Sequence, residues 1–500
     1  MAKVIMIQGT MSNAGKSLLC AGLCRIFHQD GYKVAPFKSQ NMALNSYITD
    51  DGKEIGRAQA MQAEAAGVAP SVFMNPILLK PVTNMGSQVI VNGEVLGNMK
   101  AAEYYKMKHT LVPYILSAYN KLAEEYDIIV IEGAGSPAEI NLKQGDFVNM
   151  GMAKLVDAPV LLVGDIDRGG VFAQLYGTIK LLEPEEQDRI QGMIINKFRG
   201  DVTLLEDGLR QIETLTNKQV LGVVPMLDVD IDDEDSLSSR LQKKQGIGLI
   251  DIAVIRLNKI SNFTDMAALE NIENVSLRYV REVKELGNPD MIIIPGTKNT
   301  IEDLLAIRSS GLEAQIKKKA SAGTLVLGIC GGYQMLGETI ADEGGVESGE
   351  RTCISGMGLL PIDTVFEEKK FTTKTTGKVN TLSGRLLSLS GLTVEGYELH
   401  MGQSKIRENV EADVLIQMSD GREDGCVYHN ICGTYLHGFF DSDALRKEII
   451  NMLASEKGVN LTEGMSRKAY KEMQYDKLAD GVRKSLDMNR IYKILEEGKI

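Results

Sequence analysis

Several features that would mark a particular class of protein are missing from this 500-residue chain. No apolar run approaches the length of a membrane span, which argues against an α-helical membrane protein. Positive charge is in deficit: 55 Lys and Arg residues face 67 Asp and Glu residues, for a net charge of −12. This balance argues against binding to nucleic acid through a basic surface. We therefore expect neither a nucleic acid nor a membrane as partner.

Cysteine and histidine are also scarce, with six and five copies in the whole chain. The cysteines lack the paired spacing of a zinc site, and their scatter is typical of a protein from the reducing cytosol. The first residues form a strand-like run rather than a signal peptide, so a cytoplasmic location is expected. The six cysteines are Cys20, Cys24, Cys330, Cys353, Cys426 and Cys432.

Short apolar runs alternate with longer amphipathic stretches along most of the chain. This alternation predicts an α/β protein whose parallel sheets are covered by helices on both faces. We expect a nucleotide-binding domain at 1–235, a linker at 236–247, a second α/β domain at 248–440 and a mostly helical segment at 441–500. The predicted strands are Val4–Ile7, Lys33–Pro36, Asp127–Ile131, Pro159–Val163, Met193–Ile195 and Val220–Val224 in the first domain, and Leu249–Ile255, Asp290–Pro295 and Thr324–Ile329 in the second.

A glycine-rich loop, GTMSNAGKS at 9–17, follows the first apolar run and opens a helical stretch. This is the context of a phosphate-binding loop, in which backbone N–H groups and the start of a helix hold phosphate oxygens. Lys16 supplies a charge for the outer phosphates, and the Ser17 hydroxyl suits Mg²⁺. An ordinary strand-to-helix turn is the alternative. The predicted nucleotide-binding residues are Gly9, Thr10, Asn13, Ala14, Gly15, Lys16 and Ser17.

A carboxylate would complete a Mg²⁺ site beside Ser17, because this ion keeps several waters and takes one or two protein carboxylates. Glu132 is the leading candidate since it ends an apolar strand, although a carboxylate there can instead cap the next helix. Asp50 or Asp51 is a second candidate. The acidic run at 228–235 is an alternative metal site, but such a charge-dense stretch is more typical of a solvated linker.

Polar and positively charged loops follow several predicted strands. In an open α/β sheet, ligands bind beyond the carboxyl ends of the strands, so these loops are expected to meet beside the phosphate-binding loop. Their positive charges suit an anionic ligand, while an ordinary surface position is the alternative for each one. The candidate substrate-binding residues are Lys38, Asn41, Arg57 and Arg168, with Lys197 and Arg199 as further cations.

The second domain contains a Gly-x-Cys-x-Gly turn at 328–332, between an apolar strand and a helical stretch. Such a turn projects a nucleophile at the head of a helix, where small neighbours allow a substrate to approach closely. We therefore predict that Cys330 is a nucleophile rather than a buried structural thiol. The backbone N–H groups of Gly331 and Gly296 are the expected oxyanion donors.

A cysteine nucleophile needs a base, and five histidines are available. His437, which closes the β-rich region, is the predicted base, and His400 is its rival. The other three fit ordinary surface or core positions. The acid that would orient the histidine stays open, with Glu398 and Asp441 as candidates.

The first domain resembles the dethiobiotin synthetase group. The resemblance lies in the long loop that ends in Gly-Lys-Ser, in Glu-Gly-Ala-Gly at 132–135 and in Asn-Lys at 196–197. It implies that the loop binds ATP, that Asn196 reads the adenine, and that a carboxylate is phosphorylated so that nitrogen can attack it. Partition-type ATPases carry an extra lysine where this chain has Met11, so a dimerising ATPase switch is disfavoured.

The second domain resembles the triad class of glutamine amidotransferases, in which a cysteine attacks the amide of glutamine and releases ammonia. Most of that class carry a Glu two residues after the histidine, where this chain has Phe439. The cobyric acid synthase and cobyrinate diamide synthase branch shows the same departure, together with the Gly-Tyr-Glu-x-His-x-Gly segment at 396–402. The resemblance implies a site built on Cys330 and His437.

Over nearly its whole length the chain resembles the cobyric acid synthase family, most specifically at 38–42, 45–46, 54–59, 165–172 and 196–201. This implies ATP-, Mg²⁺- and glutamine-dependent amidation of the b, d, e and g carboxylates of a corrinoid, adenosylcobyrinic acid a,c-diamide, with an enclosed or interface route for ammonia. The alternatives are an amide ligase for another polycarboxylate, such as cobyrinate, and an ATP switch with an inactive glutaminase domain. The sequence leaves a homo-oligomer open.

Overall fold

The computed structural model describes residues 2–83, 86–231, 248–270, 272–347, 349–459 and 465–498. The predicted linker at 236–247 lies outside these residues, as does the second half of the acidic run. The chain divides into two compact units: unit 1 comprises Met1–Asp235 and Lys468–Ile500, and unit 2 comprises Ser236–Arg467. Within the described ranges, no helix is both long and apolar enough to cross a bilayer.

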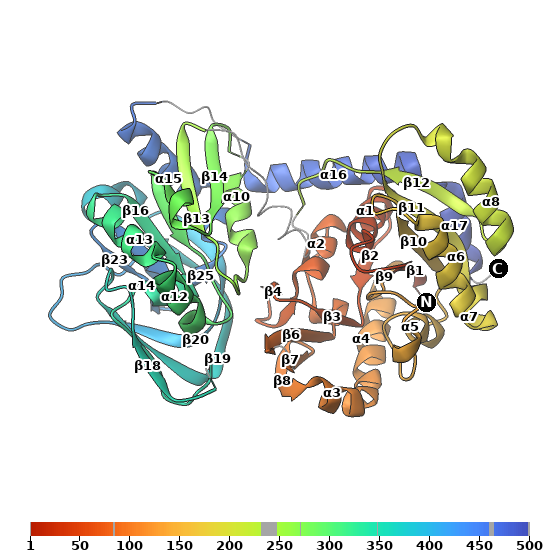
Figure 1. Cartoon of the computed structure of the whole chain (residues 1–500), viewed down its shortest axis with the longest axis horizontal. Helices are drawn as coiled ribbons and strands as arrows, with labels where there is room; N and C mark the ends of the chain where they lie inside the picture. The colour runs from red at the N-terminus through yellow and green to blue at the C-terminus, as the bar shows by residue number, and fades with distance from the viewer. Residues whose placement is uncertain are drawn as a thin grey trace. The chain divides into compact units, whose positions relative to one another are not determined.

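Unit 1 is built on a parallel six-stranded sheet (Figure 1). Side chains alternate across β1, so Ile5 and Ile7 enter one apolar cluster and Met6 enters the other. Both faces are therefore buried, as the apolar runs predict. All six predicted strands are confirmed. In sheet order they are β12 (Val220–Pro225), β11 (Ile190–Phe198), β10 (Val160–Asp165), β1 (Lys3–Gly9), β9 (Ile128–Glu132) and β2 (Val34–Phe37).

Helices cover both faces of this sheet. One apolar cluster contains residues of α1, α2, α16 and α17, and the other contains residues of α4, α5, α6 and α8. The C-terminal α16 packs tightly on α1, because a Cβ atom on Gly22 would lie only 2.8 Å from Cγ2 of Val482. The helices of unit 1 are α1 (Lys16–Gln29), α2 (Arg57–Ala65), α3 (Ala101–Met107), α4 (Val112–Glu125), α5 (Met150–Leu155), α6 (Val171–Leu181), α7 (Pro184–Arg189), α8 (Glu206–Thr216), α16 (Arg467–Ser485) and α17 (Met488–Glu497).

A second, smaller sheet of unit 1 was not predicted from the sequence. Most of its outer strand is exposed, so that strand lacks the apolar run by which the other strands were recognised. A separate hairpin, β4 (Ser46–Ile48) with β5 (Glu54–Gly56), lies between the first two strands of this sheet in the sequence. In sheet order the four strands are β3 (Gln40–Met42), β6 (Ile77–Thr83), β7 (Gly86–Val91) and β8 (Glu94–Lys100).

Unit 2 has a six-stranded central sheet that is parallel except at its last strand. The three predicted strands lie in its middle, and β14, β24 and β23 extend it on either side. In sheet order the strands are β14 (Val275–Val280), β13 (Ile250–Ile255), β15 (Met291–Ile294), β16 (Leu325–Ile329), β24 (Ile431–Thr434) and β23 (Cys426–Tyr428).

A mostly antiparallel sheet forms the β-rich part of unit 2. It contains β18 (Thr352–Ser355), β17 (Thr339–Asp342), β19 (Ile362–Val379), β20 (Thr393–Ile406) and β25 (Leu436–His437), with β21 (Ile416–Met418) and β22 (Glu423–Asp424) beside β19. The helices are α10 (Ala267–Glu270), α11 (Val283–Leu286), α12 (Thr300–Ser309), α13 (Leu312–Ser321), α14 (Gly331–Leu336) and α15 (Asp443–Glu456). The helical prediction for the C-terminal segment is confirmed by α15, α16 and α17.

Candidate active sites

The loop between β1 and α1 bends back on itself. Asn13 and Gly15 have positive φ angles of 61° and 92°, a conformation that glycine adopts freely and asparagine tolerates. A Cβ atom on Gly15 would lie 2.1 Å from Nδ2 of Asn196, so only glycine fits there. Nδ2 of Asn196 donates to the carbonyl oxygen of Ala14 at 2.9 Å. The residue expected to read the adenine thus lies against the phosphate-binding loop.

Lys16 bridges this loop and the loop that follows β9. Its Nζ donates to the carbonyl oxygens of Met11 at 3.0 Å and Gly135 at 3.2 Å. Gly9 leaves room for the lysine, because a Cβ atom there would lie 3.1 Å from Nζ. Thr10 is fixed by its hydroxyl, which donates to Gln174 at 3.0 Å. The ammonium group is therefore held over the turn of the loop, where a phosphate-binding lysine acts.

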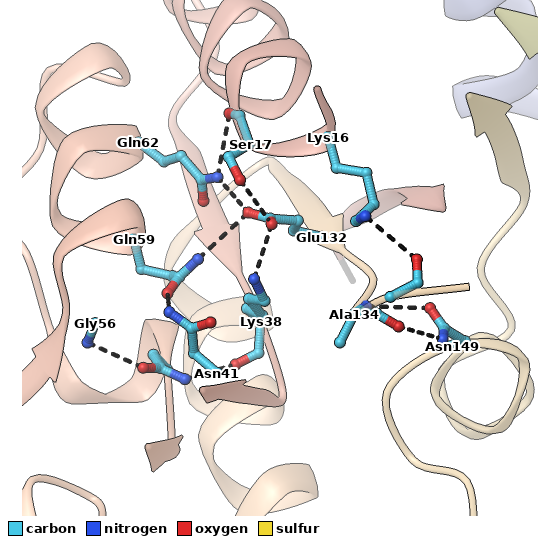
Figure 2. Close-up of polar contacts among 12 residues, drawn as sticks. Lys16, Ser17, Lys38, Asn41, Gly56, Gln59, Gln62, Glu132, Ala134 and Asn149 are labelled. Carbon is cyan, nitrogen blue, oxygen red and sulfur yellow. Dashed lines mark hydrogen bonds and ion pairs between the residues drawn. The ribbon is translucent and has the colours of Figure 1, made fainter. Parts of the chain in front are cut away.

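Glu132, at the end of β9, lies at the centre of a polar cluster (Figure 2). Its Oε1 accepts hydrogen bonds from Oγ of Ser17 at 2.9 Å and from Nζ of Lys38 at 2.8 Å. Its Oε2 accepts from Nε2 of Gln62 at 2.6 Å and of Gln59 at 3.4 Å. The strand ends of the sheet thus bring together a hydroxyl, a carboxylate and an ammonium group from distant parts of the sequence.

The electrostatics of this cluster keep Glu132 ionised. Burial raises the pKa of Glu132, but the ammonium of Lys38, the amide of Gln62 and the charge of Lys16 outweigh burial and hold this pKa below its usual range. The Ser17 hydroxyl and this carboxylate are oxygen donors of the kind that Mg²⁺ prefers, and two of them suffice for an ion that also takes phosphate and water oxygens. The residues therefore fit the metal expected from the sequence.

The other predicted residues of unit 1 lie in different surroundings. Asn41 is buried, and its Nδ2 donates to Oε1 of Gln59, which links it to the Glu132 cluster. Arg57, at the start of α2, is buried against the ring of Tyr47. Asp50 is exposed in the turn between β4 and β5, and Arg168 is exposed after β10. The Glu132 cluster therefore includes Lys38 and Asn41 among the predicted substrate-binding residues.

Cys330 occupies the strained turn that its flanking glycines predict. Its φ of 52° is rare for a residue with a side chain. The turn is held by the backbone N–H of Cys330, which donates to the carbonyl oxygen of Thr434 at 2.8 Å. A Cβ atom on Gly332 would lie 1.9 Å from the carbonyl oxygen of Ile294, so the turn needs glycine to pack against β15. The geometry is that of a nucleophile elbow between β16 and α14.

His437, Gly296 and Cys330 meet at the end of the central sheet of unit 2. A Cβ atom on Gly296 would lie 3.1 Å from Cε1 of His437 and 3.7 Å from Cβ of Cys330. Gly331 begins α14 directly after the cysteine. The predicted nucleophile, base and two oxyanion glycines therefore lie together in one small region.

Asp265 is the acid that sequence reasoning missed. Its Oδ2 lies 2.7 Å from Nδ1 of His437, and its Oδ1 accepts from the backbone N–H of Gly438 at 2.9 Å. It belongs to a short 3₁₀ helix, η5 (Phe263–Met266), in the segment that follows β13. The available signal was the run of polar residues after this strand, the same signal that marked the loops of the first domain.

The charge of Asp265 controls the protonation of His437. Burial alone lowers the pKa of His437, but the Asp265 carboxylate, together with Cys330, outweighs burial and raises this pKa to about 10. The imidazole is therefore protonated near neutral pH and can donate a proton to a leaving amine.

The rival residues have other partners. The ring of His400 stacks on Tyr435 with centroids 3.9 Å apart, and both residues line a separate cavity of about 390 Å³. Glu398 pairs with Nη1 of Arg422 at 2.7 Å. Asp441 is exposed at the end of the turn that follows His437. The contacts thus favour His437 over His400, and Asp265 as the orienting acid.

Replacing Asp265 with asparagine should lower glutaminase activity near pH 8 by about 100-fold or more, because orienting a catalytic histidine is worth effects of that order. Without the Asp265 carboxylate, only Cys330 would oppose the effect of burial, so the pKa of His437 should fall below about 10. The alkaline limb of the kcat/KM profile should therefore move from near pH 10 toward lower pH. Glutamate release measured across pH tests this, with Asp441→Asn as the control. If the alkaline limb of the Asp265→Asn variant did not shift, Asp265 would not be the acid that orients His437.

Two family models match overlapping parts of the chain. Residues 5–286 match the CobQ/CobB/MinD/ParA nucleotide binding domain, and residues 251–445 match the CobB/CobQ-like glutamine amidotransferase domain. The protein therefore combines a nucleotide-binding domain with a glutamine amidotransferase domain in one chain.

Relatives that match the chain over its whole length show to which family of such two-domain proteins it belongs. Cobyric acid synthases from Lachnoclostridium phytofermentans and Ruminiclostridium cellulolyticum are each 59% identical to the chain; the alignments cover 100% of this chain and 100% and 98% of theirs. The cobyric acid synthase of a Thermoanaerobacter species is 52% identical, with full coverage of both chains. The chain belongs to the cobyric acid synthase family. Among solved structures, PurLQS from Thermotoga maritima matches 41% of this chain and 99% of its own, at 19% identity and a TM-score of 0.33.

Proposed function

We propose that this protein is a cytoplasmic enzyme that uses ATP, Mg²⁺ and glutamine to amidate the b, d, e and g carboxylates of adenosylcobyrinic acid a,c-diamide. The observation that carries the proposal is the full-length similarity, at 59% identity, to relatives named cobyric acid synthase. The site residues support it, since the chain holds a phosphate-binding loop next to a buried carboxylate and, separately, a cysteine next to a charged histidine.

The residues of unit 2 are suited to release ammonia from glutamine. The Cys330 thiolate attacks the side-chain carbonyl carbon, and the N–H groups of Gly331 and Gly296 receive the oxyanion. His437 donates its proton to the leaving nitrogen as the carbon–nitrogen bond breaks, which leaves a thioester and ammonia. The neutral imidazole then takes a proton from water, and the water hydrolyses the thioester to glutamate. Asp265 keeps the imidazole oriented throughout.

The residues of unit 1 are suited to activate a carboxylate. Lys16 and the phosphate-binding loop position ATP, and a substrate carboxylate oxygen attacks the terminal phosphorus, with ADP as the leaving group. Ammonia then attacks the acyl phosphate, inorganic phosphate leaves, and a primary amide results. Ser17 and Glu132 would hold Mg²⁺, which neutralises phosphate charge when bound. Lys38, which pairs with Glu132 at 2.8 Å, would also donate to the incoming carboxylate.

The test is an assay with purified protein, ATP, Mg²⁺, glutamine and the a,c-diamide, followed by mass spectrometry. We expect stepwise conversion to a product with four new amides, together with release of glutamate from glutamine. Amidation of cobyrinate at the a and c positions instead would support the cobyrinate diamide synthase alternative. Glutamate release without amidation of either compound would contradict the ligase function.

A further inference from the structure

Unit 1 contains a cavity of about 700 Å³ beside the small sheet. This volume is in the range of specific small-molecule sites, which are commonly apolar with a few polar groups. Its walls come from β6, β7, the start of α3 and the segment 134–151. The apolar side chains that line it include Leu79, Val89, Met99, Tyr104, Phe147 and Met150.

One wall of this cavity is shared with the phosphate-binding site. Ala134 and Gly135 line the cavity, and the carbonyl oxygen of Gly135 accepts the hydrogen bond from Nζ of Lys16. Asn149 fixes this wall, because its side chain donates to the carbonyl of Ala134 at 2.6 Å and accepts from its N–H at 3.1 Å (Figure 2). Only the 134–135 backbone therefore separates this part of the cavity from Lys16, the lysine expected to hold the outer phosphates.

The cations of the cavity differ in their partners. Lys143 and Lys154 each lie 3.0 Å from a carboxylate oxygen of Glu186, and Lys143 also pairs with Glu183 at 3.2 Å, so both lysines already have acidic partners. Lys108 is half-buried, and within the described residues its Nζ forms no ion pair. This Nζ lies 4.6 Å from the ring centroid of Tyr105 and 5.9 Å from that of Phe147. Burial lowers the pKa of Lys108, and the charge of Asp146, which also lines the cavity, opposes this effect without outweighing it.

We propose that this cavity binds the apolar ring of the corrinoid substrate, and that Lys108 pairs with one of the carboxylates on the ring's edge. The proposal rests on the proposed function. A carboxylate that is to be phosphorylated must lie beside the outer phosphate of ATP, and the wall shared with Lys16 meets that requirement. An occupant with apolar faces and a negative charge at its edge suits this cavity, because many of its lining side chains are apolar and its half-buried Lys108 forms no ion pair within the described residues, although the charge of Asp146 acts on it.

Equilibrium dialysis of the coloured a,c-diamide against the full-length protein, without ATP or glutamine, tests the site directly. Lys108→Ala should raise Kd about tenfold, which corresponds to one charge-assisted hydrogen bond of about 1.4 kcal/mol. Lys108→Arg should restore part of the affinity. The matched control is Lys106→Ala, which removes an exposed lysine two residues away that does not line the cavity.

A second variant tests the cavity rather than the charge. Ser87 lines the cavity and is half-buried, so Ser87→Trp should fill it and abolish corrinoid binding. ATP binding and glutamate release should persist in both variants, which shows that they are folded. If the parent protein binds and amidates the corrinoid while Lys108→Ala and Ser87→Trp keep its Kd, the cavity proposal is overturned and the function stands. If the parent protein neither binds nor amidates the corrinoid, the proposed function itself fails, and the cavity proposal with it.

Discussion

Replacing Cys330 with alanine is expected to abolish glutamine-dependent amidation while ammonium-dependent amidation persists. The thiolate forms the bond to glutamine, so its loss should lower the glutamine-dependent rate by about 1,000-fold or more. The residues that handle ATP belong to unit 1 and do not change. The measurement is corrinoid amidation, followed by mass, with glutamine or with ammonium chloride at a pH that supplies free ammonia.

The matched control for this variant is Cys353→Ala, which removes an exposed cysteine on β18. It should keep both activities. If Cys330→Ala lost both the glutamine- and the ammonium-dependent reaction while remaining folded, Cys330 would not act solely in the supply of nitrogen, and the two-site scheme would be wrong.

Replacing Lys16 with alanine should impair amidation but leave the hydrolysis of glutamine intact. Amidation from either nitrogen source should fall by about 100-fold or more, because a preorganised charge on a transferring phosphoryl group is worth effects of that size. Glutamate release by Cys330 should continue, since the thioester chemistry needs no phosphate. Both products can be measured in one reaction, glutamate by a coupled assay and amide by mass.

Lys33→Ala provides the control for Lys16→Ala. Lys33 is an exposed lysine that directly precedes β2. It therefore lies at the amino ends of the parallel strands, whereas the phosphate-binding loop lies at their carboxyl ends. Its removal takes away one positive charge from unit 1 without touching the site. Amidation that survived Lys16→Ala at the parent rate would mean that this loop does not bind the reacting nucleotide.

The sequence predicted the strands that are buried on both faces, because such strands appear as short apolar runs between helical stretches. It did not predict β8, where Glu94, Val95 and Leu96 are exposed, nor the sheet to which β8 belongs. A half-exposed strand carries a weak pattern, and its pairing is decided by neighbours from other parts of the chain. The cavity of about 700 Å³ in unit 1 is built on this sheet, so the sequence did not predict it either.

In the candidate sites, likewise, the sequence predicted the residues that belong to local motifs but not the contacts between distant parts of the chain. Lys16, Ser17 and Cys330 belong to local motifs whose glycines reveal the turn that they need. The Asp265–His437 pair joins residues 172 positions apart, and neither side of the pair carries a motif for the other. Lys38 was identified as a cation near the site, but its ion pair with Glu132 at 2.8 Å depends on the adjacency of β2 and β9, which the order of strands along the chain does not show.

The packing of α16 and α17 against α1 makes unit 1 discontinuous in the sequence. A growing polypeptide emerges from the ribosome amino end first, so the apolar face of α1 is synthesised long before Leu478 and Val482, which cover it. The amidotransferase unit is contiguous and is expected to complete its fold earlier during synthesis. A chain ended after residue 466 should therefore keep glutaminase activity while its first 235 residues become sensitive to protease. Synthesis of α16 and α17, rather than synthesis of the first 235 residues, would then set the moment at which the ATP-binding unit becomes competent.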